Sequence, residues 1–402
     1  MTSSDHRQPR LPVALSAILT ALVVLLTACG GTTAATYVAS PASLAPSSSA
    51  PSSSASAAGG SSASSVGGSA VASAATGLRR VGHVFVIVLE NENYRGAFSG
   101  TSYLAKTLPA KGQLLTQYYG IGHHSLDNYV AMISGQAPDQ ATQADCARYT
   151  NFAPAHPRLR APGQAVGNGC VYPSSVKTVG DQLSAAGRSW RAYLEGMGTS
   201  CRHPRIGAID TTRVPTRTNQ YTTRHNPFMY FHSIIDKASC RTHDVGLTKL
   251  PAALKSASTT PRLSFIVPDL CDDAHEASCP DGRPGGMKAA NLWLRTWVPR
   301  IMGSAAYKKD GMLVVTFDEA DTTSTACCGE KPGPNSAKPG LTGPGGGRVG
   351  AVVLSRFVKP GTRNATPYNH YSLLATIESA FGLKRLGYAA RARAFGADVL
   401  GR

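Results

Sequence analysis

The segment His83-Val84-Phe85-Val86-Ile87-Val88-Leu89 runs directly into Glu90-Asn91. Its residues after His83 are all apolar and lack the alternation of a half-exposed strand, which is typical of a strand buried on both faces of a sheet. The abrupt change at Glu90 indicates that the strand ends there. A carboxylate and an amide oxygen at a strand end suit a divalent cation, although a polar turn with a capping Asn91 gives the same pattern.

Four more largely apolar runs of strand length alternate with helical patterns along the chain. The runs are Gln113–Tyr119, Leu263–Val267, Met312–Phe317 and Val349–Leu354. The helical patterns are Ser125–Ile133, Val176–Ala186, Phe228–Ile235, Met287–Met302 and Ser372–Phe381. Strands that alternate with helices indicate an α/β fold in which helices cover both faces of the sheet. We therefore expect a three-layer αβα sandwich with a mostly parallel central sheet and active groups at the carboxyl ends of its strands.

A second acidic pair follows another of these runs. Met312–Phe317 leads into Asp318-Glu319, with Asp321 close behind. Carboxylates that gather at the end of a buried strand repel one another unless a cation neutralises them. Together with the first pair, this pattern predicts one divalent metal ion, of unknown identity, held by Glu90, Asn91, Asp318 and Glu319.

Ser125 lies between the two acidic pairs and directly before a helical pattern. Serine is a favoured N-cap residue, so a capping role explains its position. The same position suits a nucleophile, because amides at a helix N-terminus stabilise a phosphoryl group and a metal ion activates a weakly nucleophilic hydroxyl. Asn128, one turn later on the same helix face, is then expected to bind a phosphoryl oxygen of the substrate.

The order of these motifs carries a family resemblance. The chain reads Glu-Asn after a strand, then Ser-x-x-Asn with Gly135 ten residues after the Ser, then Asp-Glu after a strand, then Pro367-Tyr368-Asn369-His370. This order resembles the bacterial phosphoesterase family of alkaline-phosphatase-like fold, which includes phospholipases C and secreted acid phosphatases. The resemblance implies that Ser125 is the nucleophile, that the two acidic pairs bind the metal, and that His370 is an active-site histidine.

Three further segments resemble one branch of that family. They are Val171-Tyr172-Pro173-Ser174, His225-Asn226-Pro227-Phe228 and Gly343-Pro344-Gly345-Gly346-Gly347. The branch is that of exported acid phosphatases, including mycobacterial ones that act on phosphoinositides. The substrate implied is a phosphate ester, either a small molecule or a phospholipid head group.

Two departures from the family pattern matter. Two-metal members of the superfamily carry Asp-x-x-x-His, whereas this chain has Cys271-Asp272-Asp273-Ala274-His275. A second metal is therefore doubtful, and His275 is expected to contact phosphate as a cation. The nucleophile is Ser rather than the Thr typical of the phospholipases C, which favours a phosphatase.

The histidines receive separate interpretations. His370 and His275 fall in matched segments and are expected to be catalytic, as donors of a proton to the leaving group. His225 is either a substrate ligand or a residue that orders its loop. His124, next to Ser125, is expected to bind substrate phosphate, although one member of the pair His123-His124 is expected to be structural.

The first residues predict export. Arg7 and Arg10 precede an apolar run from Leu11 to Leu26, and Leu26-Thr27-Ala28-Cys29 resembles a bacterial lipobox. We expect a signal peptide over 1–28, a lipidated Cys29 with a flexible Ser/Ala-rich tether over 29–77, and a catalytic domain over 78–402. A cleaved signal peptide with an incidental cysteine and an uncleaved anchor are the alternatives. The protein is then on the outer face of the cell membrane or secreted.

The number of cysteines agrees with an exported protein, whereas the net charge bears only on the kind of partner. Eight cysteines remain after Cys29, and an even number outside the cytoplasm indicates disulfides. Proximity favours Cys146–Cys170, Cys201–Cys240 and Cys271–Cys279, and leaves Cys327 and Cys328 as an adjacent pair or as partners of others. The formal charge of +17 suits phosphate-bearing or anionic lipid partners. The basic residues are dispersed without a nucleic-acid-binding motif, so nucleic acid is not expected.

Three functions are compatible with the sequence. The first is a lipid-anchored, metal-dependent acid phosphatase acting on phosphomonoesters through a phosphoserine at Ser125. The second is a phospholipase C that cleaves a phosphodiester. The third is a non-catalytic binding lipoprotein. The sequence leaves the physiological substrate and the oligomeric state open.

Overall fold

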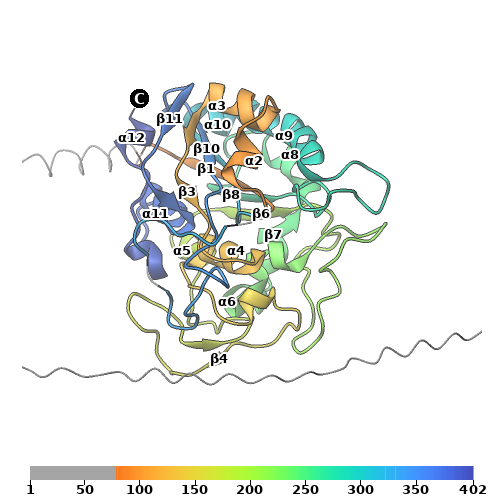
Figure 1. Cartoon of the computed structure of the whole chain (residues 1–402), viewed down its shortest axis with the longest axis vertical. Helices are drawn as coiled ribbons and strands as arrows, with labels where there is room; N and C mark the ends of the chain where they lie inside the picture. The colour runs from red at the N-terminus through yellow and green to blue at the C-terminus, as the bar shows by residue number, and fades with distance from the viewer. Residues whose placement is uncertain (1–77, 79, 322, 331, 402) are drawn as a thin grey trace, which may run out of the picture. The chain divides into compact units, whose positions relative to one another are not determined.

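A computed structural model describes residues 78, 80–321, 323–330 and 332–401 (Figure 1). The expected signal peptide, Cys29 and the tether lie outside the described residues. Among the residues described, no helix is long and apolar enough to cross a lipid bilayer. All the described residues belong to one compact unit.

An eight-stranded sheet forms the centre of this unit. In spatial order its strands are β11 (Thr362–Asn364), β2 (Gln113–Leu115), β10 (Ala351–Ser355), β9 (Gly311–Phe317), β1 (His83–Leu89), β8 (Leu263–Val267), β6 (Trp190–Leu194) and β7 (Asp244–Gly246). In this sheet β10 runs antiparallel to both neighbours, and the other pairings are parallel. Every residue of β1 is buried, as its unbroken apolar sequence predicts. The predicted mostly parallel sheet is confirmed.

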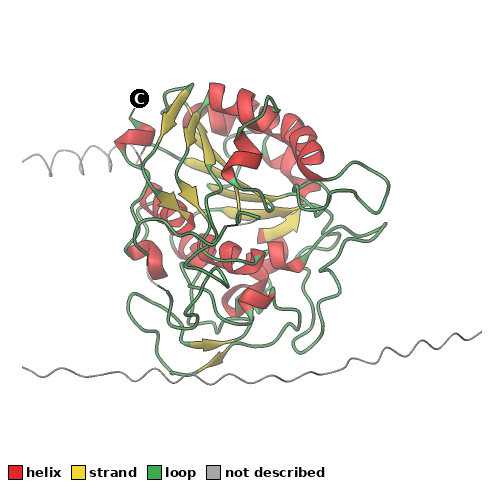
Figure 2. Ribbon diagram, in the orientation of Figure 1, coloured by secondary structure: helices red, strands yellow, loops and turns green. Residues whose placement is uncertain are grey.

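Helices cover both faces of the sheet, which confirms the predicted α/β class. Figure 1 shows α3, α9 and α10 on one side of the strands and α4, α5 and α11 on the other. Their bounds are α3 (Leu108–Lys111), α4 (Ser125–Ser134), α5 (Val179–Ala185), α9 (Gly286–Gly303), α10 (Ala305–Asp310) and α11 (His370–Ala380). Shorter helices are α2 (Tyr94–Phe98), α6 (His232–Ile235), α7 (Cys240–His243), α8 (Leu250–Ala253) and α12 (Ala397–Leu400). Figure 2 shows long loops around α4 and α6.

Two predicted elements differ from the structure. The run Gln113–Tyr119 is divided into β2 and a two-residue strand, β3 (Tyr118–Tyr119), which leaves the main sheet and pairs with β12 (Tyr368–Asn369). The predicted helix over Phe228–Ile235 is a 3₁₀ turn followed by α6, because Phe231 between them is extended, with φ −138° and ψ 118°.

Four disulfides link the eight cysteines. The three predicted pairs form, and Cys327 is bonded to its neighbour Cys328. Of the two alternatives for the last two cysteines, the adjacent pair is therefore the one observed.

Candidate active site

The two acidic pairs meet where neighbouring strands end. β1 and β9 are parallel and in register, with Leu89 beside Phe317, so Glu90 and Asp318 follow at the same edge of the sheet. Both side chains are fully buried. Burial, followed by the charge of Glu90, raises the pKa of Asp318 well above its ordinary value. Neither carboxylate oxygen of Asp318 has a hydrogen-bond donor among the described residues.

The second member of each pair completes the group. The Asn91 amide donates to Glu319 Oε1 across 3.2 Å, while Asn91 Oδ1 has no hydrogen-bond partner in the part of the chain that the structure describes. Burial raises the pKa of Glu319 to about 7, even though His123 contacts its other oxygen. The second ring nitrogen of His123 contacts the Thr323 carbonyl, so both of its nitrogens are engaged.

This donor set fits a divalent cation. Buried carboxylate oxygens without donors cost free energy, and here several converge beside an unpartnered amide oxygen. All of these atoms are hard oxygen ligands of the kind that Mg²⁺ and Ca²⁺ prefer. Glu90, Asn91, Asp318 and Glu319 could therefore hold the metal ion that the sequence predicts.

Ser125 is the first residue of α4, and it does not act as the N-cap. The N-cap position belongs to His124, whose side chain makes no capping hydrogen bond. The Ser125 hydroxyl instead donates to Glu90 Oε2 across 2.7 Å. The carboxylate of Asp145 accepts the backbone N–H of Leu126 across 3.1 Å and so fixes the start of the helix.

Asn128 supports the loop that precedes Ser125. Its side-chain oxygen accepts the backbone N–H groups of Ile121 (2.6 Å) and Gly122 (3.1 Å). Its amide nitrogen donates to the carbonyls of Gly122 (2.8 Å) and His124 (2.9 Å). The amide hydrogens are thus occupied by backbone, which differs from the expected contact with a phosphoryl oxygen.

His225 lies between two buried carboxylates. Its Nε2 is 3.1 Å from Glu90 Oε1, and its Nδ1 is 3.3 Å from Asp273 Oδ2. The ring stacks on Tyr129 with centroids 5.2 Å apart. Burial lowers the pKa of a histidine, but the two carboxylates outweigh this effect and raise that of His225. His225 therefore connects Glu90 to Asp273.

Two charged residues of the site were not identified from the sequence. Asp273 holds His225, as described, and Arg224 is a buried cation whose Nε is 3.6 Å from Asp145 Oδ2. The positive charge of Arg224 also attracts the carboxylates of Glu90 and Asp273. The available signal was position alone, since Arg224 directly precedes the His225-Asn226-Pro227 segment and Asp273 lies in the segment that contains His275.

Three further histidines were predicted to belong to the site, namely His370, His275 and His124, and they differ in burial. His370 is fully buried, with Nε2 2.5 Å from the Asp318 carbonyl and Nδ1 3.2 Å from the Tyr118 hydroxyl. Burial lowers the pKa of His370 to about 4, so this ring is neutral and engaged, unlike the expected proton donor. The side chain of His275 is 34% exposed and that of His124 is 47% exposed, so both are accessible from solvent.

Residues 100–384 match the phosphoesterase family. This chain belongs to the phosphoesterase family. The resemblance seen in the sequence motifs is thereby confirmed.

Several relatives of this phosphoesterase have named activities. An acid phosphatase of Aspergillus fumigatus is 24% identical over 75% of this chain and 55% of that protein. A phosphate-repressible acid phosphatase of Penicillium chrysogenum is 28% identical over 75% of this chain and 59% of its own length. A phosphatidylinositol-3-phosphatase of Mycobacterium tuberculosis is 24% identical over 79% of this chain and 83% of that protein. The chain thus spans little more than half the length of the two fungal relatives.

Among solved structures, a protein of the alkaline phosphatase superfamily from Vibrio parahaemolyticus is similar in fold to this chain. It aligns with 78% of this chain and 69% of its own, at 12% identity and a TM-score of 0.45.

Two observations concern a possible second metal site, one at Cys271 and one at a cluster of three carboxylates. Cys271 of this phosphoesterase is bonded to Cys279 and offers no thiolate. Among the described residues, ligand atoms of Glu195, Asp269 and Asp272 lie within 4.8 Å of one another. Arg283 already supplies positive charge there, 2.8 Å from Asp272 and 3.8 Å from Asp269.

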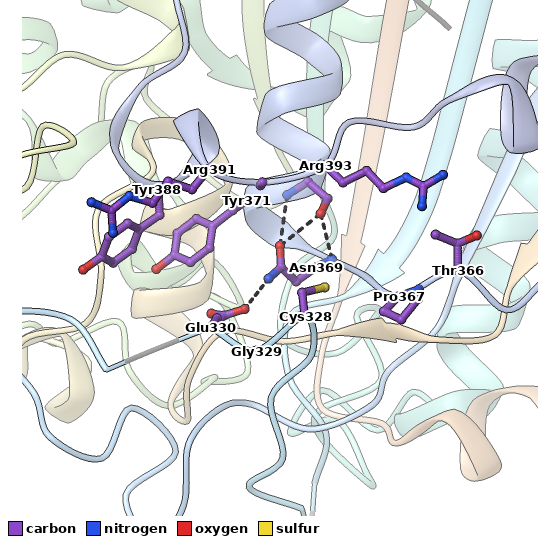
Figure 3. A pocket seen from close by; sticks show the side chains of 12 residues that line it. Cys328, Gly329, Glu330, Thr366, Pro367, Asn369, Tyr371, Tyr388, Arg391 and Arg393 are labelled. Atoms are coloured by element: carbon purple, nitrogen blue, oxygen red, sulfur yellow. Dashed lines mark hydrogen bonds between the residues drawn. The ribbon is translucent and has the colours of Figure 1, made fainter. Parts of the chain in front are cut away.

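A cavity of about 540 Å³ lies beside the start of α11 (Figure 3). Its lining includes Glu330, Asn369, Tyr371 and Tyr388, with Cys328 at one side. The Asn369 amide donates to the Glu330 carboxylate, and burial raises the pKa of Glu330 to about 8. None of the predicted catalytic, substrate-binding or metal-binding residues lines this cavity.

Proposed function

We propose that this phosphoesterase is a metal-dependent acid phosphatase that hydrolyses phosphomonoesters through a phosphoserine at Ser125. The observation that carries the proposal is the hydrogen bond from the Ser125 hydroxyl to Glu90, a carboxylate that faces the unpartnered oxygens of Asp318. This contact joins a candidate nucleophile to a candidate metal ligand. The two fungal relatives, both named acid phosphatases, support the same reaction class.

A divalent cation bound by Glu90, Asn91, Asp318 and Glu319 would lower the pKa of a coordinated hydroxyl and withdraw charge from a phosphoryl oxygen. The chain itself provides position and charge. Glu90 orients Ser125 Oγ and accepts its proton as Oγ forms a bond to phosphorus and the bond to the leaving oxygen breaks. The amino end of α4 and the buried charge of Arg224 favour the anionic phosphoryl group. Water then attacks phosphorus and gives a proton to the histidine that protonated the leaving oxygen. The bond to Ser125 Oγ breaks, Glu90 returns the proton to Oγ, and inorganic phosphate is released.

His275 is the proposed donor of the proton that the leaving oxygen needs. It is accessible at its exposed edge, and its backbone N–H donates to Asp273 Oδ1 across 2.9 Å, which fixes the turn that carries it. His370, the other candidate, is proposed to position Asp318 through its backbone carbonyl. General acid catalysis of this kind contributes about 10²–10⁴-fold in rate. His124, beside Ser125, is proposed as an accessible ligand of substrate phosphate.

The relative named phosphatidylinositol-3-phosphatase supports a phosphoinositide as the substrate. The bond cleaved would then be that of a phosphomonoester. The alternative is a phospholipase C that cleaves the diester. Rates on a chromogenic phosphomonoester, a phosphoinositide and phosphatidylcholine, each with and without a chelator, distinguish the two. Faster release of phosphocholine from phosphatidylcholine than of phosphate from the monoesters would replace the phosphatase by a phospholipase C. No turnover of any of them would favour the non-catalytic binding lipoprotein.

Export and lipid anchoring are part of the same proposal. The motif Leu26-Thr27-Ala28-Cys29 supports cleavage before Cys29 and lipidation of its thiol. Cys29→Ser should then release the protein from the membrane fraction while its activity on a soluble phosphomonoester is kept. Mature protein that begins at Met1 would contradict processing at Cys29.

A further inference from the structure

Residues 205–217 form a surface segment that exposes branched aliphatic side chains, and we call it the arginine–aliphatic segment. Its sequence is Arg-Ile-Gly-Ala-Ile-Asp-Thr-Thr-Arg-Val-Pro-Thr-Arg. Ile206, Ile209 and Val214 are 44%, 62% and 70% exposed. These three account for half of the large hydrophobic side chains exposed in the described part of the chain, the others being Leu159, Leu292 and Leu341. Such concentration in one segment is typical of a surface that meets an apolar partner.

The charges on this segment have a single sign at the surface. Arg205, Arg213 and Arg217 are exposed, and none lies within 4 Å of a carboxylate in the described part of the chain, although Arg217 is near enough to Asp281 to interact with its charge. The one acidic residue, Asp210, is buried and accepts hydrogen bonds from the backbone and hydroxyl of Thr212. The segment therefore presents aliphatic groups and cations to solvent with no carboxylate between them.

Hydrogen bonds hold the backbone of the segment in place. Gly207 and Asp210 donate to the carbonyls of Tyr149 (2.7 Å) and Ala147 (3.0 Å), and Tyr149 donates to the Ala208 carbonyl (2.8 Å). The Arg148 guanidinium donates to the Gly207 carbonyl across 2.6 Å. The exposed aliphatic groups are thus presented by an ordered backbone, which reduces the entropy lost when the surface binds.

The segment is also joined to the active site. Arg224, the buried cation of the site, donates to the Arg213 carbonyl across 2.6 Å. The Thr223 N–H donates to the Thr212 hydroxyl across 2.8 Å. Val214 therefore directly follows Arg213, whose carbonyl contacts the Arg224 side chain of the site. A partner bound at the segment would come close to the reacting phosphate.

We propose that the arginine–aliphatic segment docks this phosphoesterase on the surface of an anionic lipid bilayer. Aliphatic side chains insert at the boundary between head groups and acyl chains, while arginines beside them bind lipid phosphates. A bilayer offers both partners at once, since lipid phosphates and acyl chains lie side by side at its surface. The choice of a phosphate-bearing lipid as substrate rests on the proposed function, but docking itself requires no catalysis.

Tryptophan substitution at residue 214 gives a local readout in the full chain. Val214→Trp is mixed with vesicles that contain brominated phosphatidylcholine, either alone or with phosphatidylglycerol. Bromine atoms on the acyl chains quench a tryptophan that enters the bilayer. Leu292→Trp is the matched control, because Leu292 is 55% exposed but lies on α9, across the sheet from α4 (Figure 1).

We expect quenching beyond that of the native tryptophans for Val214→Trp with the anionic vesicles only, and none for Leu292→Trp. Adding Arg205→Gln, Arg213→Gln and Arg217→Gln to Val214→Trp should weaken this signal roughly 100-fold in lipid concentration, since each basic residue near an anionic surface contributes about fivefold. The vesicles contain no phosphomonoester, so the result is independent of the phosphatase proposal. An inactive Ser125→Ala chain should give the same quenching.

Two results would overturn the docking proposal. Equal quenching at residues 214 and 292 would show that another part of the chain brings the protein to the vesicle. Absence of quenching, together with a dimer that Val214→Asp converts to a monomer, would make the segment an interface between two copies. Docking also predicts that Val214→Asp lowers turnover of a phosphoinositide in anionic vesicles at least tenfold while hydrolysis of a soluble phosphomonoester is unchanged.

Discussion

The Ser125 hydroxyl donates a hydrogen bond to Glu90 Oε2 across 2.7 Å, although the two residues are 35 positions apart. Ser125 begins a helix, and Glu90 follows the central strand of the sheet. An N-cap serine would accept a bond from an N–H of its own helix, whereas this hydroxyl donates to a carboxylate. The contact therefore favours a nucleophile over a cap and orients its oxygen toward the proposed metal site.

The first prediction concerns Ser125→Ala. If Ser125 is the nucleophile, kcat should fall at least about a thousandfold, with residual turnover from the surrounding charges. Since one buried hydrogen bond is lost, the free energy of unfolding should change by only about 1 kcal/mol. Steady-state kinetics and chemical denaturation measure the two effects separately.

Ser125→Thr is the control, because it keeps a hydroxyl and should retain part of the activity. Acid quenching with a labelled substrate should place phosphate on the peptide that contains Ser125 in the native protein. Near-normal turnover by Ser125→Ala would show that the nucleophile is another residue.

The second prediction separates metal binding from folding through Asp318→Asn. The buried Asp318 carboxylate has no donor and faces Glu90, so without a cation its charge opposes folding. An amide removes that charge and can donate to Glu90. We expect the melting temperature of the metal-free protein to rise while activity and metal content are lost.

Asp321→Asn is the matched control, since Asp321 is an exposed carboxylate in the same turn and outside the proposed ligand set. Its activity should remain close to that of the native protein. Calorimetry and elemental analysis report stability and metal content. Full activity in native protein shown to be free of metal would contradict the proposed site.

The sequence predicted the central strands well, because burial on both faces leaves an unbroken apolar run. β1 and β8 have the predicted bounds, and β9 begins one residue earlier. β6, β7 and the three-residue edge strand β11 were missed. Arg191 interrupts the apolar character of β6, and β7 is three residues long, so neither shows the pattern of a buried strand. Only their pairing with neighbours defines them.

The residues of the site were likewise predicted only in part. Residues that follow strands were placed correctly near one another, because parallel strands bring their carboxyl ends to one edge. Arg224 lies in a three-residue 3₁₀ helix and Asp273 in a loop, and neither has a periodic pattern that would give the position of its side chain. Asn128 has the spacing of a substrate ligand, yet its amide is engaged by the backbone of residues 121–124. Sequence spacing does not reveal which partner such a group finds.

The third prediction ranks two disulfides. Cys201–Cys240 closes a loop of 39 residues, and Cys271–Cys279 closes one of 8. In the loop-entropy model, removing the longer link should cost roughly 4 kcal/mol and removing the shorter one roughly 2.5 kcal/mol. Paired Cys→Ser variants, unfolded in guanidinium chloride, give both values. A larger loss for the shorter link would show that it holds the turn of His275 by contacts in the folded state.

The fourth prediction is a pH dependence that one buried residue controls. Asp244 is fully buried, and its Oδ1 accepts a hydrogen bond from the Asn226 amide across 2.9 Å while Oδ2 has no partner. Burial raises the pKa of Asp244 to about 7 in the folded protein, against 3.8 in the unfolded chain. Between these values the folded state holds a proton that the unfolded state lacks. Stability contributed by this group is therefore fully present below about pH 4 and is lost as pH rises toward 7.

Asp244→Asn tests this dependence because asparagine mimics the protonated carboxyl in shape and is uncharged at every pH. The native protein should lose about 1.4 kcal/mol of unfolding free energy for each pH unit between 5 and 7 through this residue. The variant should lack that slope and be the more stable protein at pH 8. Urea unfolding at pH 5, 6, 7 and 8 gives both curves, and their difference isolates Asp244 from other groups that titrate. Parallel curves would mean that Asp244 stays ionised when buried, and its negative charge would then have to be balanced by groups around Asn226.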